Sequence, residues 1–232
     1  MKARLYLIPT PLGSHAPADV LPAPVLERIA SLRRFFVEEL RTARRFLSAA
    51  GLKGHIDSLE LYEINEHSTP EQISSYEPLL GTRDAALISE AGLPAVADPG
   101  AQLVAMAHRK GVEVVPHPGP SSLMMALMAS GLNGQCFAFN GYLPVKQEAR
   151  RSVIRSLEAA ARKQNQSQII IETPYRNDAL MADLLAVCNP DTRICVAASI
   201  TCPDQMIVTL TAAQWKKNPA TIGKRPCVFI LL

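Results

Sequence analysis

Short apolar runs alternate along the chain with longer stretches in which apolar residues recur every three or four positions. In the first half, the apolar runs predict strands at 5–8, 35–37, 85–88 and 112–115. Helical spacing between them predicts helices at 25–32, 40–50 and 103–108. A further helix should begin at Thr69, because Thr69-Pro70-Glu71-Gln72 combines an N-cap threonine, a proline at the first helical position and a glutamine two residues later.

The second half continues the same alternation. Its apolar runs predict strands at 137–139, 169–171, 194–197, 206–210 and 228–232. Its helical patterns cover 123–129, 150–162 and 179–187. The run at 206–210 alternates apolar and polar residues, which is typical of an edge or hairpin strand.

Strands that alternate with helices favour an α/β fold with a mostly parallel sheet. The segment His117-Pro118-Gly119-Pro120 interrupts this pattern near the midpoint and is the best linker candidate. We therefore predict two α/β domains, 1–117 and 118–232. The first should hold a parallel-rich sheet between about residue 3 and residue 116, and the second a mixed sheet that includes 206–210 and 228–232.

Composition excludes several classes of protein. Of the 232 residues, 48% are hydrophobic and 19% are charged, which is typical of a packed globular chain. No stretch approaches the ~20 apolar residues of a membrane helix, and the apolar run before Pro9 is too short for a signal peptide. We therefore expect a cytoplasmic protein with no membrane association. A net charge of +3 is too small to indicate nucleic-acid binding by itself.

The five cysteines form no C-x-x-C pair, and the histidines lack metal-ligand spacing. Free thiols in a reducing compartment therefore fit better than a disulfide framework, and no metal site is expected.

Three loops that contain glycine follow predicted strands, at 9–13, 89–94 and 118–122. Ligands bind at the carboxyl ends of strands in open α/β sheets, although ordinary strand-to-helix turns also use glycine and proline. None of the loops matches G-x-G-x-x-G or the P-loop pattern, so a Rossmann dinucleotide site is disfavoured. The segment 89–100 is the most specific signal. Within it, either the segment Asp98-Pro99-Gly100 caps the following helix or Asp98 faces a ligand.

Taken in order, these loops resemble the tetrapyrrole methylase-like superfamily, the class III S-adenosylmethionine-dependent methyltransferases. The branch that they resemble most methylates the ribose 2′-oxygen of bacterial small-subunit ribosomal RNA. In the first half, the family patterns P-T-P-I-G-N, A-E-D-T-R, S-D-A-G-T-P…D-P-G and V-P-L-P-G-P correspond to 9–14, 37–41, 89–100 and 115–120. In the second half, G-F-L-P corresponds to 141–144 and Y-E-S-x-x-R to 171–176. The resemblance runs from residue 4 to the last predicted strand.

The resemblance implies the two-domain class III methyltransferase fold, with S-adenosyl-L-methionine in a cleft between the domains. The positions that it assigns to the cofactor are Leu12, Gly13, Ala91, Gly92, Leu93, Val96, Ser121, Ser122 and Glu172. Helix capping is the alternative role for Ser121 and Ser122, and a solvated strand end is the alternative for Glu172. The superfamily dimerises, so a homodimer is expected.

The chain departs from the family pattern at several positions. Glu90 stands for aspartate, Leu93 for threonine, and Glu39-Leu40 for the acidic-threonine step. The family's R-E-L-T-K stretch is here Ala198–Cys202, without charge. Polar residues of a pocket cannot become apolar without changing what the pocket accepts, so the cofactor carries over more securely than the acceptor.

Catalysis and acceptor binding have fewer candidates. A ribose hydroxyl is a weak nucleophile, so a general base helps, and the candidates are Glu38 and Glu39, with Arg41 beside them and Glu172 as a further carboxylate. The residues expected at the acceptor are Lys146, Tyr175 and Arg176. A solvated helix face is the plainer interpretation of the other arginines, which cluster around residues 33–45 and 150–162.

The sequence thus predicts an S-adenosylmethionine-dependent methyltransferase that acts on RNA at a ribose 2′-oxygen. One alternative is a tetrapyrrole or other small-molecule methyltransferase. A second is a non-catalytic S-adenosylmethionine-binding module, which the missing charges of the R-E-L-T-K stretch allow.

Overall fold

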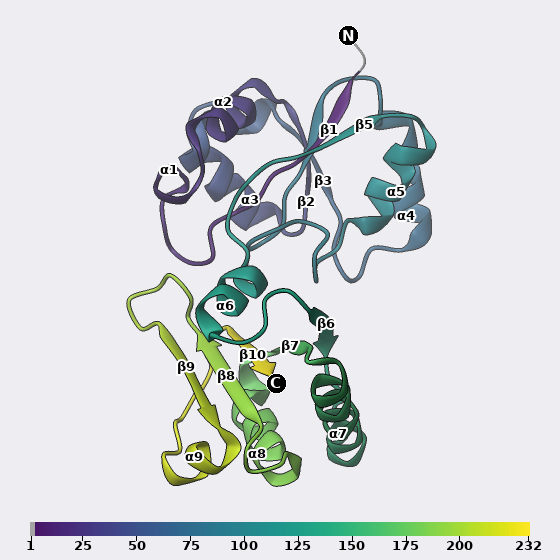
Figure 1. Ribbon diagram of the computed structural model, residues 1–232. Coiled ribbons are helices and arrows are strands. Elements are labelled where there is room, and N and C mark those ends of the chain that lie inside the picture. The colour runs from purple at the N-terminus through teal and green to yellow at the C-terminus, as the bar shows by residue number, and fades with distance from the viewer. Residues whose placement is uncertain (1–2) are drawn as a thin grey trace. The chain divides into compact units, whose positions relative to one another are not determined.

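The structure, a computed structural model, describes residues 3–232, which fold into two compact units, 3–121 and 122–232. Figure 1 shows the elements of each unit. The strands of the first unit are β1 (Arg4–Leu7), β2 (Arg34–Val37), β3 (Glu60–Glu63), β4 (Ala85–Leu87) and β5 (Glu113–Pro116). Its α-helices are α1 (Pro17–Val20), α2 (Ala23–Ser31), α3 (Leu40–Leu47), α4 (Pro70–Ser75) and α5 (Ala101–Arg109). Short helical turns cover Ser48–Leu52, Ile56–Ser58 and Glu77–Leu79.

The first unit has a five-stranded sheet in the order β3-β2-β4-β1-β5, and every strand pair is parallel. Neighbouring residues of a strand point to opposite faces. Tyr6 and Phe35 therefore pack with α2 and α3 on one face, whereas Leu5 and Phe36 pack with α4 and α5 on the other. Apolar residues on both faces explain why the strands read as uninterrupted apolar runs. The predicted parallel-rich sheet is confirmed.

The second unit contains β6 (Phe137–Tyr142), β7 (Ser167–Glu172), β8 (Arg193–Ala198), β9 (Met206–Thr211) and β10 (Cys227–Leu231). Its α-helices are α6 (Ser122–Ser130), α7 (Gln147–Gln164), α8 (Asn177–Val187) and α9 (Ala212–Lys217), and a helical turn covers Pro174–Arg176. The sheet order is β6-β7-β10-β8-β9. Only β6 and β7 pair in parallel, and the other pairs are antiparallel. The predicted mixed sheet, with β9 at its edge, is therefore confirmed.

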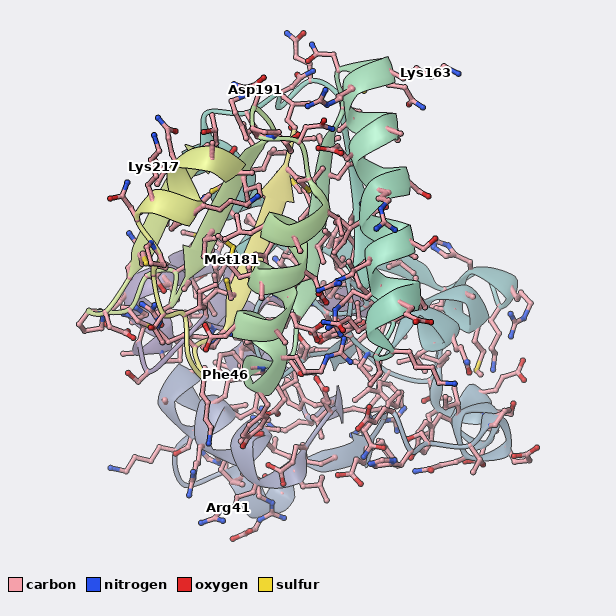
Figure 2. The ribbon with its side chains drawn as sticks, turned by 90° about the horizontal axis from the view of Figure 1, so that it is seen from below. Arg41, Phe46, Lys163, Met181, Asp191 and Lys217 are labelled. Carbon is pink, nitrogen blue, oxygen red and sulfur yellow. The ribbon has the colours of Figure 1, made fainter. Side chains whose placement is uncertain are left out.

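Helices α7, α8 and α9 cover one face of the second sheet. Ile154, Leu184 and Trp215, one from each helix, are buried in a single core with the strands. The indole N–H of Trp215 donates to the carbonyl of Ile194 at 2.8 Å, so its polar atom has a partner inside that core. The basic residues Lys163 and Lys217, at the ends of α7 and α9, point outward in Figure 2 and lie where cations favour the helix dipole.

The start of α4 agrees with the sequence prediction, and α5 begins directly after the segment 98–100. Thr69 is the N-cap of α4, and its hydroxyl accepts from the backbone N–H of Gln72 at 3.2 Å. At α5, the segment Asp98-Pro99-Gly100 caps the helix, but it does so through Gly100 and not through the Asp98 side chain. The N-cap is Gly100, with φ of 123° and no side-chain cap. A Cβ at Gly100 would lie 2.6 Å from Leu87 Cδ2, so the close approach to β4 requires glycine there.

No helix among residues 3–232 is both long enough and apolar enough to cross a membrane. The same part of the chain contains no group of three or more histidine, cysteine, aspartate or glutamate residues that could hold a metal ion.

Candidate active site

The loops that follow β1 and β4 are joined by backbone hydrogen bonds. Thr10 and Gly92 form an isolated antiparallel bridge, in which each N–H donates to the other's carbonyl, at 2.9 and 3.0 Å. The Thr10 hydroxyl also donates to the Ser89 carbonyl at 3.2 Å. Gly92 has φ of 82°, and a Cβ there would lie 3.2 Å from Leu12 Cδ2. Glycine therefore lets the two loops approach each other closely.

The loop after β5 lies against the same place. The backbone N–H of His117 donates to the Leu7 carbonyl at 2.9 Å. A Cβ at Gly119 would lie only 2.4 Å from Pro9 Cβ, so only glycine fits against the β1 loop. The three loops that the sequence singles out are therefore neighbours at the carboxyl edge of the first sheet, which is where open α/β sheets bind ligands.

The carboxyl groups of Glu38, Glu90 and Asp98 lie near this edge. Glu38 follows β2, and its Oε2 accepts from the backbone N–H of Glu90 at 3.1 Å. Burial raises the pKa of Glu38, and the charges of Asp98 and Glu90 add to this effect. Burial also raises the pKa of Asp98. Among residues 3–232, no ion pair joins any of these three carboxyl groups to a basic side chain. This edge of the first sheet is therefore acidic.

The structure separates the two adjacent glutamates of the predicted catalytic set. Glu39 is the N-cap of α3, and its carboxylate accepts from the backbone N–H groups of Arg41 at 2.9 Å and Thr42 at 2.7 Å. These two hydrogen bonds lower the pKa of Glu39. Glu38 does not cap a helix, and its pKa is raised. Arg41 is exposed and points outward from α3 (Figure 2).

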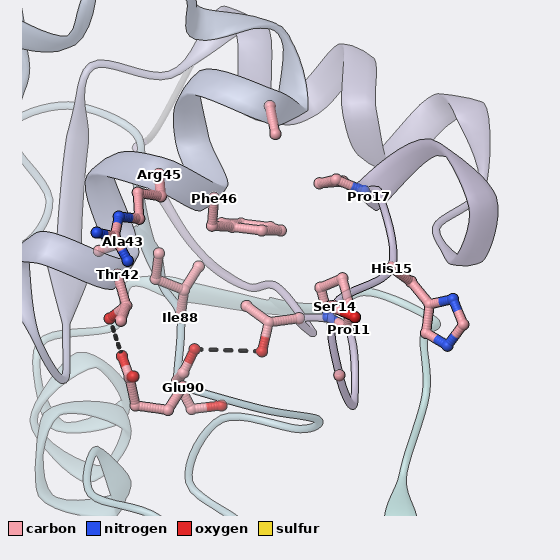
Figure 3. A pocket seen from close by; sticks show the side chains of 14 residues that line it. Pro11, Ser14, His15, Pro17, Thr42, Ala43, Arg45, Phe46, Ile88 and Glu90 are labelled. Carbon is pink, nitrogen blue, oxygen red and sulfur yellow. Dashed lines mark hydrogen bonds between the residues drawn. The ribbon is translucent and has the colours of Figure 1, made fainter. Parts of the chain in front are cut away.

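A cavity of about 460 Å³ opens beside these loops within the first unit. Pro11, Ser14 and Pro17 line one part of it, and Thr42, Phe46 and Glu90 line another. Figure 3 shows the Phe46 ring reaching from α3 into this space, with the Thr42 hydroxyl bonded to the Glu90 carboxylate at its rim. We call this cavity the α3 pocket.

The remaining predicted residues belong to the second unit. Glu172 is buried at the end of β7, and its carboxylate accepts from the backbone N–H of Thr173 at 2.7 Å and from Arg176. Arg176 also donates to the Leu143 carbonyl at 2.9 Å. Tyr175 is 80% exposed, with the Lys224 ammonium 4.9 Å from its ring centre. Glu172 is therefore an ion-pair partner and not a solvated strand end.

Exposure of the other predicted residues varies along the loops. Gly92 is buried, whereas Leu12, Leu93, Ser121 and Ser122 are half-buried. Gly13, Ala91, Val96 and Lys146 are exposed. Of the predicted cofactor positions, only Gly13 lines the α3 pocket.

Thr42 and Phe46 are not among the residues predicted from the sequence, where Glu90 stands only as a departure from the family pattern. Thr42 and Phe46 are four residues apart, so they lie on one side of α3. That spacing was the available signal, but the contact with Glu90 spans 48 positions and no local pattern reveals it.

The loops fit a ligand such as S-adenosyl-L-methionine. Gly92 and Gly119 let the three loops approach one another at one edge of the sheet, and the backbone of Gly119 is exposed there. The unpaired carboxyl groups suit a ligand that carries a sulfonium and an ammonium.

Comparison with known proteins gives the family. Residues 4–215 match the model of the Tetrapyrrole (Corrin/Porphyrin) Methylases, a family that uses S-adenosyl-L-methionine as methyl donor. The chain is 32% identical to Ribosomal RNA small subunit methyltransferase I of Vibrio cholerae over 85% of its length and 65% of the relative's. It is 29% identical to the protein of that name from Pseudomonas aeruginosa, over 98% of this chain and 78% of the relative. It thus spans less than two thirds of the Vibrio relative.

Solved structures show the same fold. The methyltransferase CobJ matches with a TM-score of 0.63 at 17% identity, over 99% of this chain and 93% of that one. Diphthine synthase matches with a TM-score of 0.68 at 15% identity, over 99% and 90%. The predicted class III methyltransferase fold is therefore confirmed.

Proposed function

The chain belongs to the tetrapyrrole (corrin/porphyrin) methylase family, and on that premise we propose that it is an S-adenosylmethionine-dependent methyltransferase of ribosomal RNA. The observation that carries the proposal is the convergence of three loops beside Glu38, a carboxyl group with a raised pKa. The small-subunit RNA as substrate, and a ribose 2′-oxygen as acceptor, follow from the names of the relatives and from the motif order. The site of action would be the cytoplasm.

The loops of the first unit would hold the methyl donor. The residues of this unit proposed to contact it are Leu12, Gly13, Ala91, Gly92, Leu93, Val96 and Ser121. Gly92 supports this assignment because its positive φ and missing side chain let the loops after β1 and β4 meet at the carboxyl edge of the sheet. Leu93 replaces a hydroxyl with an apolar group, which weakens one polar contact by about 0.5–1.5 kcal/mol and does not abolish binding.

S-adenosyl-L-methionine supplies an electrophilic methyl group with a good leaving group. What the chain must add is alignment, exclusion of water and a base for the hydroxyl proton. Glu38 is the proposed base, because burial raises its pKa and makes its carboxylate a stronger proton acceptor. The acceptor oxygen would form its bond to the methyl carbon as the carbon–sulfur bond breaks, and the hydroxyl proton would pass to Glu38.

Acceptor binding would use exposed positive charge. Arg41 and Lys146 are exposed, and Tyr175 offers an open aromatic face. Arg176 has a different role in this proposal, since its contacts with Glu172 and the Leu143 carbonyl make it a positioning residue. Arg150 is also excluded as a phosphate contact, because it is buried and binds the buried carboxylate of Asp183.

The test is methyl transfer to small ribosomal subunits isolated from a strain that lacks this gene. Labelled methyl groups should appear in the small-subunit RNA and resist alkali at one ribose position. Isothermal titration with S-adenosyl-L-methionine and its demethylated product checks the donor site separately. Binding without transfer to RNA or tetrapyrroles would instead support a non-catalytic binding module, and transfer only to a tetrapyrrole would support a small-molecule enzyme.

A further inference from the structure

The α3 pocket is distinct from the positions proposed for the methyl donor. Pro11, Ser89 and Glu90 line the pocket, whereas Leu12 and Gly92 do not. Leu12 and Gly92 instead approach each other, at the bridge that joins the two loops. The pocket therefore offers room for a second chemical group next to the donor loops, and Gly13 is shared by both.

The walls of the pocket suit a flat, partly apolar ring. Phe46 presents an aromatic ring from α3, and Pro11, Pro17 and Ile88 add apolar surface (Figure 3). At about 460 Å³, the volume lies within the range of small-molecule sites. A base that stacks on an aromatic side chain is a recurring mode of single-stranded RNA recognition.

One edge of the pocket is polar. The Glu90 carboxylate is oriented by the hydroxyl of Thr42, and Ser14 adds a second polar group. A carboxylate accepts hydrogen bonds from the amino groups on base edges. Arg45 also lines the pocket, is exposed, and lies next to Phe46 in sequence, where a guanidinium can contact a backbone phosphate.

We propose that the α3 pocket receives one unstacked nucleobase of the RNA acceptor, which stacks on Phe46 while Arg45 contacts its phosphate. This inference rests on the proposed function and adds the position where the acceptor is held. It assigns Phe46 to substrate binding, and it predicts that loss of the aromatic face weakens RNA binding without weakening donor binding.

The experiment measures anisotropy of a labelled, short single-stranded RNA of mixed sequence and of the same ribose-phosphate chain without bases. Phe46→Leu keeps apolar packing against the α2 and α3 core but removes the aromatic face. We expect it to weaken binding of the complete RNA by about tenfold, the scale of one base–aromatic contact. Phe46→Trp should restore binding. The matched control, Tyr76→Leu, changes an aromatic residue on the other face of the sheet and should have no effect.

The baseless chain separates stacking from charge. Phe46→Leu should not change its binding, whereas Arg45→Ala should weaken both RNAs and lower the salt dependence of binding. Arg109→Ala, at the exposed end of α5, is the matched control for charge. Titration with S-adenosyl-L-methionine should give the same affinity for every variant.

Equal binding of the complete RNA by Phe46→Leu and the parent would overturn the inference, as would equal weakening of the complete and the baseless chain. A parent that binds neither RNA would overturn it as well. The proposed function fails on a different result, namely the absence of methyl transfer to the small subunit. If the parent methylates the subunit and Phe46→Leu binds RNA and methylates normally, the role of the α3 pocket is refuted. The proposed function is not.

Discussion

The adjacent residues Glu38 and Glu39, which follow β2, have different roles because only Glu39 binds the first turn of α3. Glu39 binds the free N–H groups of Arg41 and Thr42, which are among the donors that every helix start leaves unsatisfied. Glu38 accepts a single N–H, from Glu90, and stays half-buried beside other carboxyl groups. The residue sequence Glu38-Glu39 does not distinguish them, since the cap depends on where the helix begins.

Glu38→Gln should lower the rate of methyl transfer by about 10²–10⁴-fold, because glutamine cannot accept the proton. The same change should raise the melting temperature at neutral pH. The pKa of Glu38 is raised in the folded protein, so its charge costs stability above its ordinary pKa, and glutamine removes that cost. Single-turnover assays and thermal melts over a pH series check both effects.

Glu39→Gln is the matched control and should behave in the opposite way. The pKa of Glu39 is lowered by the capping hydrogen bonds, so its contribution to stability is present above its ordinary pKa and is lost as the pH falls. The variant should melt earlier than the parent at neutral pH, equally at acidic pH, and still transfer methyl groups. If Glu39→Gln lost methyl transfer while Glu38→Gln kept it, the base would be Glu39 and not Glu38.

Gly92→Val should abolish binding of S-adenosyl-L-methionine. Valine at φ of 82° is strained by about 1–3 kcal/mol, and its Cβ would press on Leu12 at 3.2 Å. Gly111→Val is the control for backbone strain. Gly111 also has a positive φ, 66°, but no atom lies within 4 Å of a Cβ added there. Isothermal titration should show donor binding by Gly111→Val and none by Gly92→Val. Comparable affinities of the two variants for S-adenosyl-L-methionine would show that the loop after β4 does not bind the donor.

At the scale of elements, a buried ion-pair cluster holds α7 against α8. Asp183 of α8 has no exposed side-chain surface, and its carboxylate accepts from Arg150 and Arg151 at 2.7 Å each and from Gln147 at 3.0 Å. Burial alone would raise the pKa of Asp183, but the donors, Arg151 and Arg150 foremost, outweigh burial and lower it. The charged residues of α7 thus serve packing and not only solvation.

Asp183→Ala should destabilise the protein by about 3–5 kcal/mol, because it leaves the buried Arg150 without its carboxylate. The lowered pKa of Asp183 means that this contribution is present above the ordinary aspartate pKa and disappears as the pH falls. Urea denaturation at neutral and acidic pH measures the difference. Asp191→Ala, at an exposed turn of the same unit, should cost little at either pH. Equal losses in the two variants would contradict the role of the cluster.

Sequence periodicity predicted those elements whose apolar residues are continuous or helically spaced. It missed β3, an edge strand that reads Glu60-Leu61-Tyr62-Glu63 and is only half-buried. It also missed α9, although Thr211 and Gln214 form a capping box at its start. The α3 pocket could not be predicted at all, because its walls come from segments that only the parallel sheet order brings together.

At the scale of the whole molecule, β6 is an edge strand, and within residues 3–232 it pairs with β7 alone. It carries three aromatic side chains that remain open to solvent, Phe137 at 40%, Phe139 at 37% and Tyr142 at 57%. An exposed strand edge with apolar side chains invites pairing with another chain unless it is covered. The homodimer expected from the family resemblance would cover the exposed side chains of β6.

We therefore expect the parent protein to be a dimer at micromolar concentration and Phe139→Lys to be a monomer, as measured by light scattering. A buried lysine would lose its hydration at the contact, whereas in the monomer it stays solvated, so the charge penalises association and not folding. Leu40→Lys, which places the same charge at an exposed apolar residue of α3, should leave the dimer intact. A monomeric parent would refute the homodimer, and a dimeric Phe139→Lys would move its interface away from β6.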